Sequence, residues 1–235
     1  MVKCRVNRPI EGRILNATIS QTPSGKYFVS VCCTDVNMQP HKSTGALVGI
    51  DLGLKEFAIT SDNQHIQNPK YLKQSEIKLA KLQKQLSRKS SGSNNRNKAR
   101  IKVARQYEKI SNQRLDFLHK TSIKFIKNYD VICIEDLQIK NMVKNRKLVK
   151  LINDVSWGEF TRQLQYKSQW YGKTVQKINK FYPSSQLCGV CGYQNKNIKD
   201  LSIREWDCPY CNTHHNRDEN ASQNILKEGL RLFNS

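Results

Sequence analysis

The chain has 235 residues, which suffices for one sizeable domain and a small satellite but not for three independent cores. Lysine and arginine total 40 against 19 acidic residues, a formal net charge of +21. This excess indicates a polyanionic partner, because basic side chains that neutralise phosphates release counterions. The sequence has neither an amphipathic anchor nor a lipidation signal, so the charge favours nucleic acid over a membrane surface.

No targeting or membrane segment is expected. Residues 1–5 lead into no apolar stretch, and the longest apolar runs, such as residues 131–134, are too short to span a bilayer. We therefore expect a soluble intracellular protein. Four of the eight cysteines are scattered and are predicted to be small buried hydrophobic residues: Cys4, Cys32, Cys33 and Cys133.

The first part of the chain predicts a β hairpin. Residues 13–19 and 27–31 alternate in the manner of strands, and Pro23-Ser24-Gly25 between them is typical of a turn. A polar linker follows over about residues 36–45.

Three short strands are predicted next, at residues 47–53, 57–60 and 65–67. The first is an apolar strand interrupted by one carboxylate, Asp51. Tight connections between successive strands favour antiparallel pairing. Three such strands are typical of the opening of a ribonuclease H-like sheet, with the first carboxylate on its first strand.

A helical hairpin with a strong positive charge is predicted after these strands. From Ser75 leucines recur at three- and four-residue steps, residues 87–97 break the pattern, and a second helix begins near Lys98. Residues 73–127 hold 16 lysine and arginine residues against three acidic ones. A charge run is usually a solvated helix face, but surface helices normally mix signs. The scarcity of acidic residues therefore favours contact with phosphates.

A buried strand and a second basic stretch are predicted next. Residues 131–134 predict a strand that ends in Glu135, and residues 138–150 are basic with no acidic residue. Seven residues of the two basic stretches are candidate nucleic-acid contacts: Lys98, Arg100, Lys102, Arg105, Lys144, Arg146 and Lys147.

The following segments predict a helix, a strand and a closing helix. Ser156 is a candidate N-cap for a helix that runs to about Tyr171, with Glu159 three positions on as in a capping box. A strand is predicted at 174–178 and a last helix at about 218–232. Four aromatic residues could stack on bases, although packing in the core is the commoner role: Trp157, Trp170, Tyr171 and Tyr182.

Two CxxC motifs predict a metal site. Cys188 and Cys191 form the first, and Cys208 and Cys211 form the second, with 16 residues between the motifs. This is the spacing of a zinc ribbon, in which four thiolates complete a closed tetrahedral shell with a structural role. Free thiols and a redox pair are the alternatives. Two histidines close behind the second motif could displace one cysteine: His214 and His215.

Three carboxylates form a second constellation. Asp51 and Glu135 sit in or at the end of apolar strands, where an unpaired charge is costly, and Asp218 opens the last helix. The N-cap of that helix is the alternative role for Asp218. Three converging carboxylates without cysteine or histidine partners suit Mg²⁺ or Mn²⁺, and two such ions would activate water for phosphodiester hydrolysis.

Five sequence blocks occur in a characteristic order. They are Val48-Gly49-Ile50-Asp51-Leu52-Gly53-Leu54-Lys55, Ile134-Glu135-Asp136-Leu137, Trp157-Gly158-Glu159-Phe160, Pro183-Ser184-Ser185-Gln186-Leu187-Cys188 and Arg217-Asp218-Glu219-Asn220-Ala221. They resemble the signature blocks of TnpB, the OrfB-type protein of bacterial and archaeal insertion sequences. That family is similar to the ancestor of type V CRISPR effectors and acts as an RNA-guided DNA endonuclease. The resemblance runs from about Val48 to the C-terminus.

The resemblance implies an α/β, ribonuclease H-like (RuvC) fold with a mixed sheet, flanking helices and an inserted four-cysteine zinc ribbon. It makes Asp51, Glu135 and Asp218 the three catalytic carboxylates, which hold Mg²⁺ or Mn²⁺. The neighbouring acids Asp136 and Glu219 are not the matching positions. The implied partners are DNA and a guide RNA, in the cytoplasm and nucleoid of a prokaryote. The implied ligands of structural Zn²⁺ are Cys188, Cys191, Cys208 and Cys211.

The N-terminal part departs from the family pattern. Members usually begin with a wedge domain that a helical recognition domain interrupts, and residues 1–46 resemble only the last hairpin of that wedge. We therefore expect an N-terminally truncated protein, with the missing portion as a further partner in trans. The expected domains are the wedge remnant, a nuclease core with its basic hairpin, the zinc ribbon and the last nuclease segment: 1–46, 47–185 with 73–127, 186–216 and 217–235.

Two other functions fit parts of this pattern. A non-catalytic nucleic-acid-binding regulator or accessory transposition protein would account for the charge, but loss of a carboxylate would be its mark, and all three are present. A transposase would use similar carboxylates for strand transfer, but the sequence has no helix-turn-helix or comparable module to bind transposon ends. A metal-dependent nuclease is thus the leading interpretation.

Overall fold

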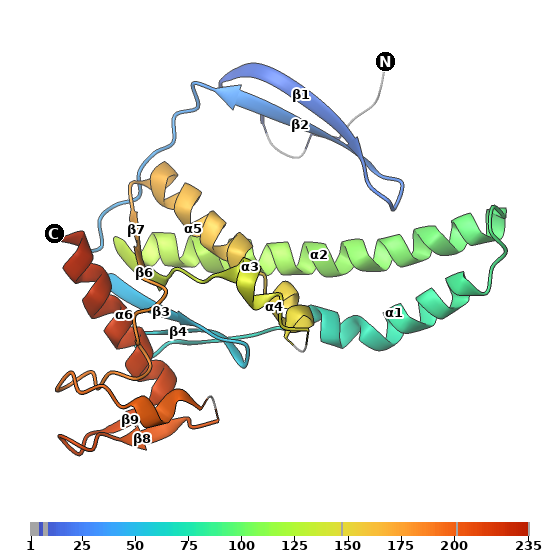
Figure 1. The fold of residues 1–235 in the computed structure, drawn as a ribbon. Helices are drawn as coiled ribbons and strands as arrows, with labels where there is room; N and C mark the ends of the chain where they lie inside the picture. Colours follow the sequence, from blue (N-terminus) through green and yellow to red (C-terminus); the bar gives the residue numbers. More distant parts are fainter. Residues whose placement is uncertain (1–4, 7–8, 147, 201, 235) are drawn as a thin grey trace. The chain divides into compact units, whose positions relative to one another are not determined.

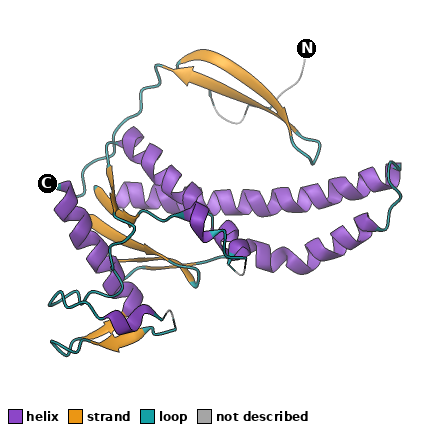
Figure 2. Ribbon diagram, viewed as in Figure 1, coloured by secondary structure: helices purple, strands orange, loops and turns teal. Residues whose placement is uncertain are grey.

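The computed structural model describes residues 5–6, 9–146, 148–200 and 202–234 (Figures 1 and 2). Two residues considered above, Cys4 and Lys147, lie outside this range. The chain divides into two compact units. The first comprises Met1–Gln39 and Leu72–Gln113, and the second comprises Pro40–Tyr71 and Arg114–Ser235.

The first unit contains the predicted β hairpin. Strands β1 (Arg13–Gln21) and β2 (Tyr27–Thr34) pair antiparallel. Gly25, with a φ of +88°, donates its backbone N–H to the carbonyl oxygen of Thr22 at 2.9 Å and closes the predicted turn. The prediction that Cys32 is buried is wrong: its side chain is exposed and that of the next cysteine is half-buried, because a two-stranded hairpin leaves most of its side chains in solvent.

Two helices, α1 (Tyr71–Ser87) and α2 (Asn94–Asn128), form the predicted helical hairpin. Both begin about four residues earlier than predicted. At α2 the reason is local, because Ser93 Oγ accepts a hydrogen bond from the backbone N–H of Arg96 at 3.1 Å. The serine and asparagine residues that suggested a break therefore start the helix. From Arg114 onward α2 belongs to the second unit.

Five strands form a mixed sheet in the second unit. Their order is β5-β4-β3-β6-β7. The neighbours β3, β4 and β5 are antiparallel, as predicted, while β6 is parallel to β3 and β7 is parallel to β6. The strands span Leu47–Leu52 (β3), Glu56–Thr60 (β4), His65–Gln67 (β5), Val131–Glu135 (β6) and Thr174–Ile178 (β7).

One face of the sheet packs against α2 and α5 (Trp157–Tyr171). Alternate residues of a strand point to opposite faces, and Ile50 and Ile134 are fully buried on this face. They join Leu118 of α2 and Phe160 of α5 in one apolar core. Full burial of such a side chain is worth ~1.5–3 kcal/mol, so this core holds the sheet and the helices together.

The other face packs against α6 (Arg217–Phe233), which Figure 1 shows alongside β3 and β6. Cys133 is buried here, which confirms the prediction for this cysteine. The approach is close at two glycines. A Cβ on Gly229 would overlap the side chain of Cys133, and a Cβ on Gly49 would overlap the backbone oxygen of Ser222. Residues without a Cβ at these positions allow α6 to lie directly on the sheet.

Two short helices, α3 (Ile139–Met142) and α4 (Val149–Val155), connect β6 to α5. The capping box predicted at the start of α5 is wrong. Ser156 has a φ of +57° and caps nothing with its side chain, and its hydroxyl donates to the carbonyl oxygen of Asn153 at 2.7 Å. Glu159 instead forms an ion pair within α5. The physical reason is that Ser156 is the single residue between the end of α4 and the start of α5, and this tight junction requires a left-handed backbone.

The segment between β7 and α6 forms a small subdomain with a core of its own. It contains the 3-10 helix η1 (Lys196–Lys199) and two antiparallel strands, β8 (Glu205–Asp207) and β9 (His214–Asn216). Ile198 and Trp206 are buried in its core. Across the described residues of the whole chain, no helix has the length and apolarity needed to cross a membrane.

Candidate functional site

Asp51 and Glu135 are neighbours because their strands pair in register. Ile50 of β3 is the parallel partner of Ile134 of β6, and the next residue on each strand is one of the two carboxylates. Alternation along the strands turns both carboxylates away from the core around Ile50 and Ile134. They therefore lie at the carboxyl ends of two adjacent strands, on the face that α6 covers.

The third carboxylate, Asp218, reaches the same edge through α6. A Cβ on Gly49 would overlap the backbone oxygen of Ser222 and lie 2.6 Å from the backbone nitrogen of Leu226. Asp218, Ser222 and Leu226 are four residues apart and share one stripe of the helix. Four residues of helix advance about 6 Å, and two residues of strand, from Gly49 to Asp51, advance about 6.6 Å. Asp218 thus comes to the level of Asp51.

The N-cap of α6 is Asn216, so the alternative role proposed for Asp218 is wrong. The side-chain oxygen of Asn216 accepts hydrogen bonds from the backbone N–H groups of Asp218 at 3.1 Å and Glu219 at 3.2 Å. Asparagine takes the cap because it stands just before the first helical residue. The carboxylate of Asp218 is then available to other groups, and Arg204 Nη1 lies 3.0 Å from it.

The three carboxylates repel one another in a partly buried setting. The pKa of Asp51 is raised to about 8. Burial is the main cause, the charges of Glu135 and Asp218 add to it, and two nearby arginines oppose it only in part. Burial also raises the pKa of Glu135, against the hydrogen bond that Ser184 donates to it. A cation can displace the protons and relieve this repulsion, so the donor set fits a hard divalent ion.

Sequence reasoning missed two residues that contact these carboxylates. Ser184 donates its hydroxyl to Glu135, and Asn224 of α6 holds Ser184 by donating to its carbonyl oxygen at 2.8 Å. Arg204, from the small subdomain, pairs with Asp218. Both residues lie outside regular periodic patterns, so spacing could not find them. The one signal is that Ser184 lies in one of the five blocks that carry the family resemblance.

The two acids adjacent to these carboxylates have basic partners of their own. Asp136 pairs with Lys177 at 3.3 Å. Glu219 lies 3.4 Å from the ring of His65, whose other nitrogen is 2.6 Å from Glu56. The hydrogen bond to Glu56 is the main reason that the pKa of His65 is raised.

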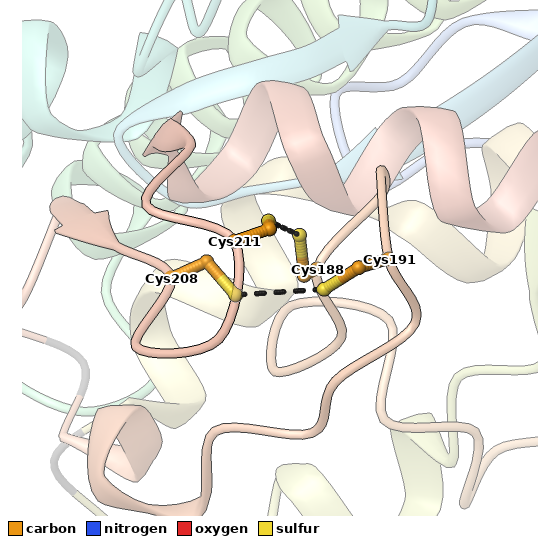
Figure 3. Close-up of side chains that lie close together, drawn as sticks. All are labelled: Cys188, Cys191, Cys208 and Cys211. Carbon is orange, nitrogen blue, oxygen red and sulfur yellow. Dashed lines mark hydrogen bonds between the residues drawn. The ribbon is translucent and has the colours of Figure 1, made fainter.

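The cysteines of the two CxxC motifs form one cluster (Figure 3). The sulfurs of Cys188 and Cys211, and those of Cys191 and Cys208, are 3.6 Å apart, and all four lie within 4.8 Å of one another. A disulfide would need about 2.05 Å, whereas thiolates about 2.3 Å from one tetrahedral ion stand ~3.8 Å apart. The cluster can therefore hold a metal ion.

The carboxylate group is more open than the cysteine cluster. In the described part of the chain, no other set of three or more His, Cys, Asp or Glu side chains brings its ligand atoms within 4.8 Å of one another.

The two histidines behind the second CxxC motif have other contacts. The ring of His215 is buried beside Trp206, with Nε2 3.0 Å from the sulfur of Cys188. His214 is exposed, and its Nδ1 lies 2.8 Å from Asp207. Neither histidine replaces a cysteine, because the four sulfurs form a complete set without them.

The start of α6 connects the cysteine cluster to the carboxylates. Asn220, two residues after Asp218, accepts a hydrogen bond from the backbone N–H of Gly189 at 2.9 Å and donates to the carbonyl oxygen of Leu187 at 2.7 Å. Gly189 lies inside the first CxxC motif. Together with the ion pair from Arg204, these bonds make the position of Asp218 depend on the fold of the cysteine subdomain.

The basic candidates in the described residues are exposed. Four lie on α2 and two lie in the segment between α3 and α4, where their charges can reach a phosphate: Lys98, Arg100, Lys102, Arg105, Lys144 and Arg146.

The four aromatic candidates occupy different environments. Trp157 is buried in the main core. Tyr171 is half-buried and stacks on His41 at 4.3 Å, and Tyr182 is half-buried against the core under α6. Trp170 is 45% exposed. Packing therefore accounts for three of the four, and the ring of Trp170 is open to solvent.

The fold resembles that of two solved nucleoproteins. Cas12f1, solved with its sgRNA and target DNA, gives a TM-score of 0.56 at 18% identity, covering 88% of this chain and 55% of that one. CRISPR-Cas12f in a ternary complex gives 0.53 at 19% identity, covering 85% of this chain and 41% of that one. At these identities the likeness concerns the fold alone.

The family follows from the sequence comparison. Residues 29–146 match the OrfB family of IS605 elements, described as a probable transposase. Residues 157–225 match the Cas12f1-like TNB domain. The chain therefore belongs to the OrfB_IS605 family.

Curated relatives carry names that refer to guided nucleases. A candidate RNA-guided DNA endonuclease of Streptomyces pristinaespiralis is 43% identical over 213 residues, covering 91% of this chain and 52% of the relative. InsQ of Escherichia coli (strain K12), named likewise, is 34% identical over 243 aligned residues, covering 97% and 60%. A TnpB-like protein of Methanocaldococcus jannaschii is 27% identical over 135 residues, covering 57% and 30%. The chain spans about half the length of the first two relatives.

Proposed function

We propose that Asp51, Glu135 and Asp218 form a RuvC-type catalytic centre in a metal-dependent DNA endonuclease, which is RNA-guided in its complete assembly. The strand order supports a ribonuclease H-like sheet, since three antiparallel strands are followed by two that are parallel to the first. The names of the relatives support the reaction class and the partners, DNA and a guide RNA.

The observation that carries the proposal is the convergence of three acids, of which only Asp218 has an ion-pair partner, Arg204, among the described side chains. The pKa of Asp51 is raised to about 8 by burial and then by the other two carboxylates. A purely structural site would pair or remove these charges, because uncompensated buried charge is costly. Such strain is characteristic of sites where charge is needed for binding or chemistry.

Each residue has a stated part in this site. Asp51, Glu135 and Asp218 would hold Mg²⁺ or Mn²⁺, which supplies an activated water and stabilises the leaving 3′ oxygen when bound. Ser184 fixes the carboxylate of Glu135 by donating a hydrogen bond to it. Arg204, half exposed, offsets the charge of Asp218 and can turn toward a substrate phosphate once a cation takes that carboxylate.

The four cysteines would hold structural Zn²⁺. Their spacing fits a tetrahedral shell that leaves no position for water, so the ion would stabilise the ribbon of residues 186–216 rather than act on substrate. In the same scheme residues 1–46 are a wedge remnant, residues 47–185 are the nuclease core and residues 217–235 complete it. The basic hairpin at 73–127 would bind phosphates.

The test separates cleavage from binding. In the complete, guide-loaded assembly, Asp51→Ala, Glu135→Ala and Asp218→Ala should each abolish Mn²⁺- or Mg²⁺-dependent cleavage of DNA. They should leave DNA binding largely intact, because metal ligands do not contact bases. Alanine at the adjacent acids, Asp136 and Glu219, is the matched control and should preserve cleavage.

The same assay distinguishes the competing functions. Binding with no cleavage in the complete assembly, with a guide RNA and its matched DNA, would favour a non-catalytic regulator. Joined rather than hydrolysed DNA ends would favour a transposase. Full cleavage by any of the three alanine variants would show that the site is wrongly assigned.

A further inference from the structure

A cavity of about 340 Å³ lies beside Glu135, at the end of β6. Its walls come from the residues that follow β6 and from the turn that follows β7. In open α/β sheets, ligands bind outside the carboxyl ends of the strands, which is where this cavity lies. Its volume is at the small end of the range for pockets that hold one small molecule, about 300–1,000 Å³. It has room for one base but not for a run of nucleotides.

The aromatic ring of Phe181 forms one wall and is 80% exposed. The turn holds it outward, because the backbone N–H of Phe181 donates to the side chain of Asn179 at 2.9 Å. An exposed phenylalanine gains nothing from burial in its own fold. It does offer a flat face to a partner, and aromatic faces in proteins that bind single strands stack on bases of any sequence.

The charges around the cavity favour a neutral ring over a phosphate. Two carboxylates, Glu135 and Asp136, are in its wall. Asp136 is offset by Lys177 at 3.3 Å, but Glu135 receives only the neutral hydroxyl of Ser184 among its described partners. A phosphate inside this cavity would be repelled, whereas an uncharged base would not be.

Polar groups suited to a base and its backbone are also present. The amide side chains of Gln138 and Asn141 line the cavity and are exposed, and an amide can both donate to and accept from the edge of a base. Lys180, which also lines the cavity, has its Nζ 4.8 Å from the centre of the Phe181 ring, where it can meet the phosphate that follows a stacked base. These charges favour a base inside the cavity and its phosphate outside the cavity.

We propose that this cavity binds one nucleobase of a single-stranded substrate, next to the phosphate that is cleaved, with Phe181 stacked on the base. The inference rests on the proposed function in one respect: it takes the neighbouring Glu135 as part of the catalytic centre. The cavity positions the strand, because a base held here places its adjoining phosphate at the carboxylates. Stacking on Phe181 accepts any base, while the amide side chains of Gln138 and Asn141 provide a modest preference among bases.

The test uses the purified chain and two oligonucleotides of equal length, one of thymidine and one of abasic sites, without added Mg²⁺ or Mn²⁺. Raised salt weakens the phosphate contacts of the basic surface and exposes the contribution of the base. Tryptophan in place of Phe181 (Phe181→Trp) is a local reporter, and its fluorescence, measured against the native chain, should be quenched by the thymidine strand and not by the abasic strand. Phe181→Ala should weaken binding of the thymidine strand by roughly 5- to 100-fold and leave the abasic strand unchanged.

The matched control is Phe233→Ala, which removes another exposed phenylalanine at the far end of α6. It should change neither affinity. Equal quenching by both strands, an equal loss for both strands in Phe181→Ala, or no loss at all would overturn the proposal. Failure of the proposed function gives a different result. Base-dependent quenching without any cleavage would support the base-binding cavity and contradict the nuclease. Cleavage without base dependence would support the nuclease and contradict the base-binding cavity.

Discussion

Replacing Asp51 by asparagine should stabilise the protein at neutral pH in the absence of Mg²⁺ or Mn²⁺, although it should remove the proposed activity. The pKa of Asp51 is raised from 3.8 to about 8, first by burial and then by the charges of Glu135 and Asp218. In the unfolded chain these causes disappear. The charged form is therefore less favourable in the folded protein, and the neutral amide of asparagine, which has the same shape, avoids that cost.

The sign and the size follow from proton linkage. Between pH 3.8 and about 8 the folded state binds more protons at Asp51 than the unfolded state does, so the free energy of unfolding falls as pH rises through this window. Outside this pH window, Asp51 does not change how the free energy of unfolding depends on pH. At 1.36 kcal/mol per pH unit over roughly three units, the cost at neutral pH reaches about 4 kcal/mol. Water penetration and relaxation reduce it, so we expect Asp51→Asn to gain about 1–4 kcal/mol.

Urea unfolding at pH values that span this window measures the effect. The gain from Asp51→Asn should grow as pH rises, and added Mg²⁺ should stabilise the native chain more than the variant. Asp136→Asn is the control, because its pair with Lys177 is partly exposed to solvent, and it should change the free energy of unfolding by less than about 1 kcal/mol. A gain that is equal at all pH values, or a loss at neutral pH, would refute the account of the raised pKa.

Metal removal, charge removal and one added methyl group test other parts of the structure. Elemental analysis should find one Zn²⁺ for the four-cysteine cluster, and protein without stoichiometric zinc or iron would contradict this. Chelation of the zinc should unfold residues of about 186–216. It should also weaken Mg²⁺ or Mn²⁺ binding, because Asn220 ties this subdomain to α6. Gly49→Ala should cost ~1–3 kcal/mol in urea unfolding, since its Cβ meets the α6 backbone. Gly158→Ala, with its nearest neighbour at 3.9 Å, should gain up to about 1 kcal/mol, and equal effects would mean that α6 does not approach the sheet this closely. Replacing four basic residues by glutamine should lower the magnitude of the log–log salt slope of nucleic-acid binding by up to about 2.8–3.6, at ~0.7–0.9 per phosphate. These residues are Lys98, Arg100, Lys102 and Arg105. An unchanged slope would show that they do not contact phosphates.

The sequence by itself determined the elements of this protein, because their signals are local. Alternation predicted β1 and β2, and the turn at Gly25 has the positive φ that glycine favours. The strand that ends in Glu135 and the two-residue spacing within each CxxC motif were likewise read directly. The compact cluster of four sulfurs confirms that the two motifs come together, and the Zn²⁺ that the spacing predicts stays a prediction.

Helix ends were less well determined, although their signals are also local. Ser156 and Glu159 have the spacing of a capping box, but a second helix ends just before Ser156 and the backbone there is left-handed. The hydroxyl consequently points back to α4. At Ser93 the reverse occurred, since polar residues that resemble a break cap α2. A capping motif specifies a possible hydrogen bond, and the junction between two helices decides whether it forms.

Only the tertiary structure decided how the candidate site is assembled. The resemblance named Asp51, Glu135 and Asp218, but their proximity depends on the register of two parallel strands and on the close packing of α6 against Gly49. The hydrogen bond from Ser184 and the ion pair from Arg204 arise in the same way. Contacts between segments far apart in the chain depend on which surfaces fit together, and such a fit leaves no periodic pattern in the sequence.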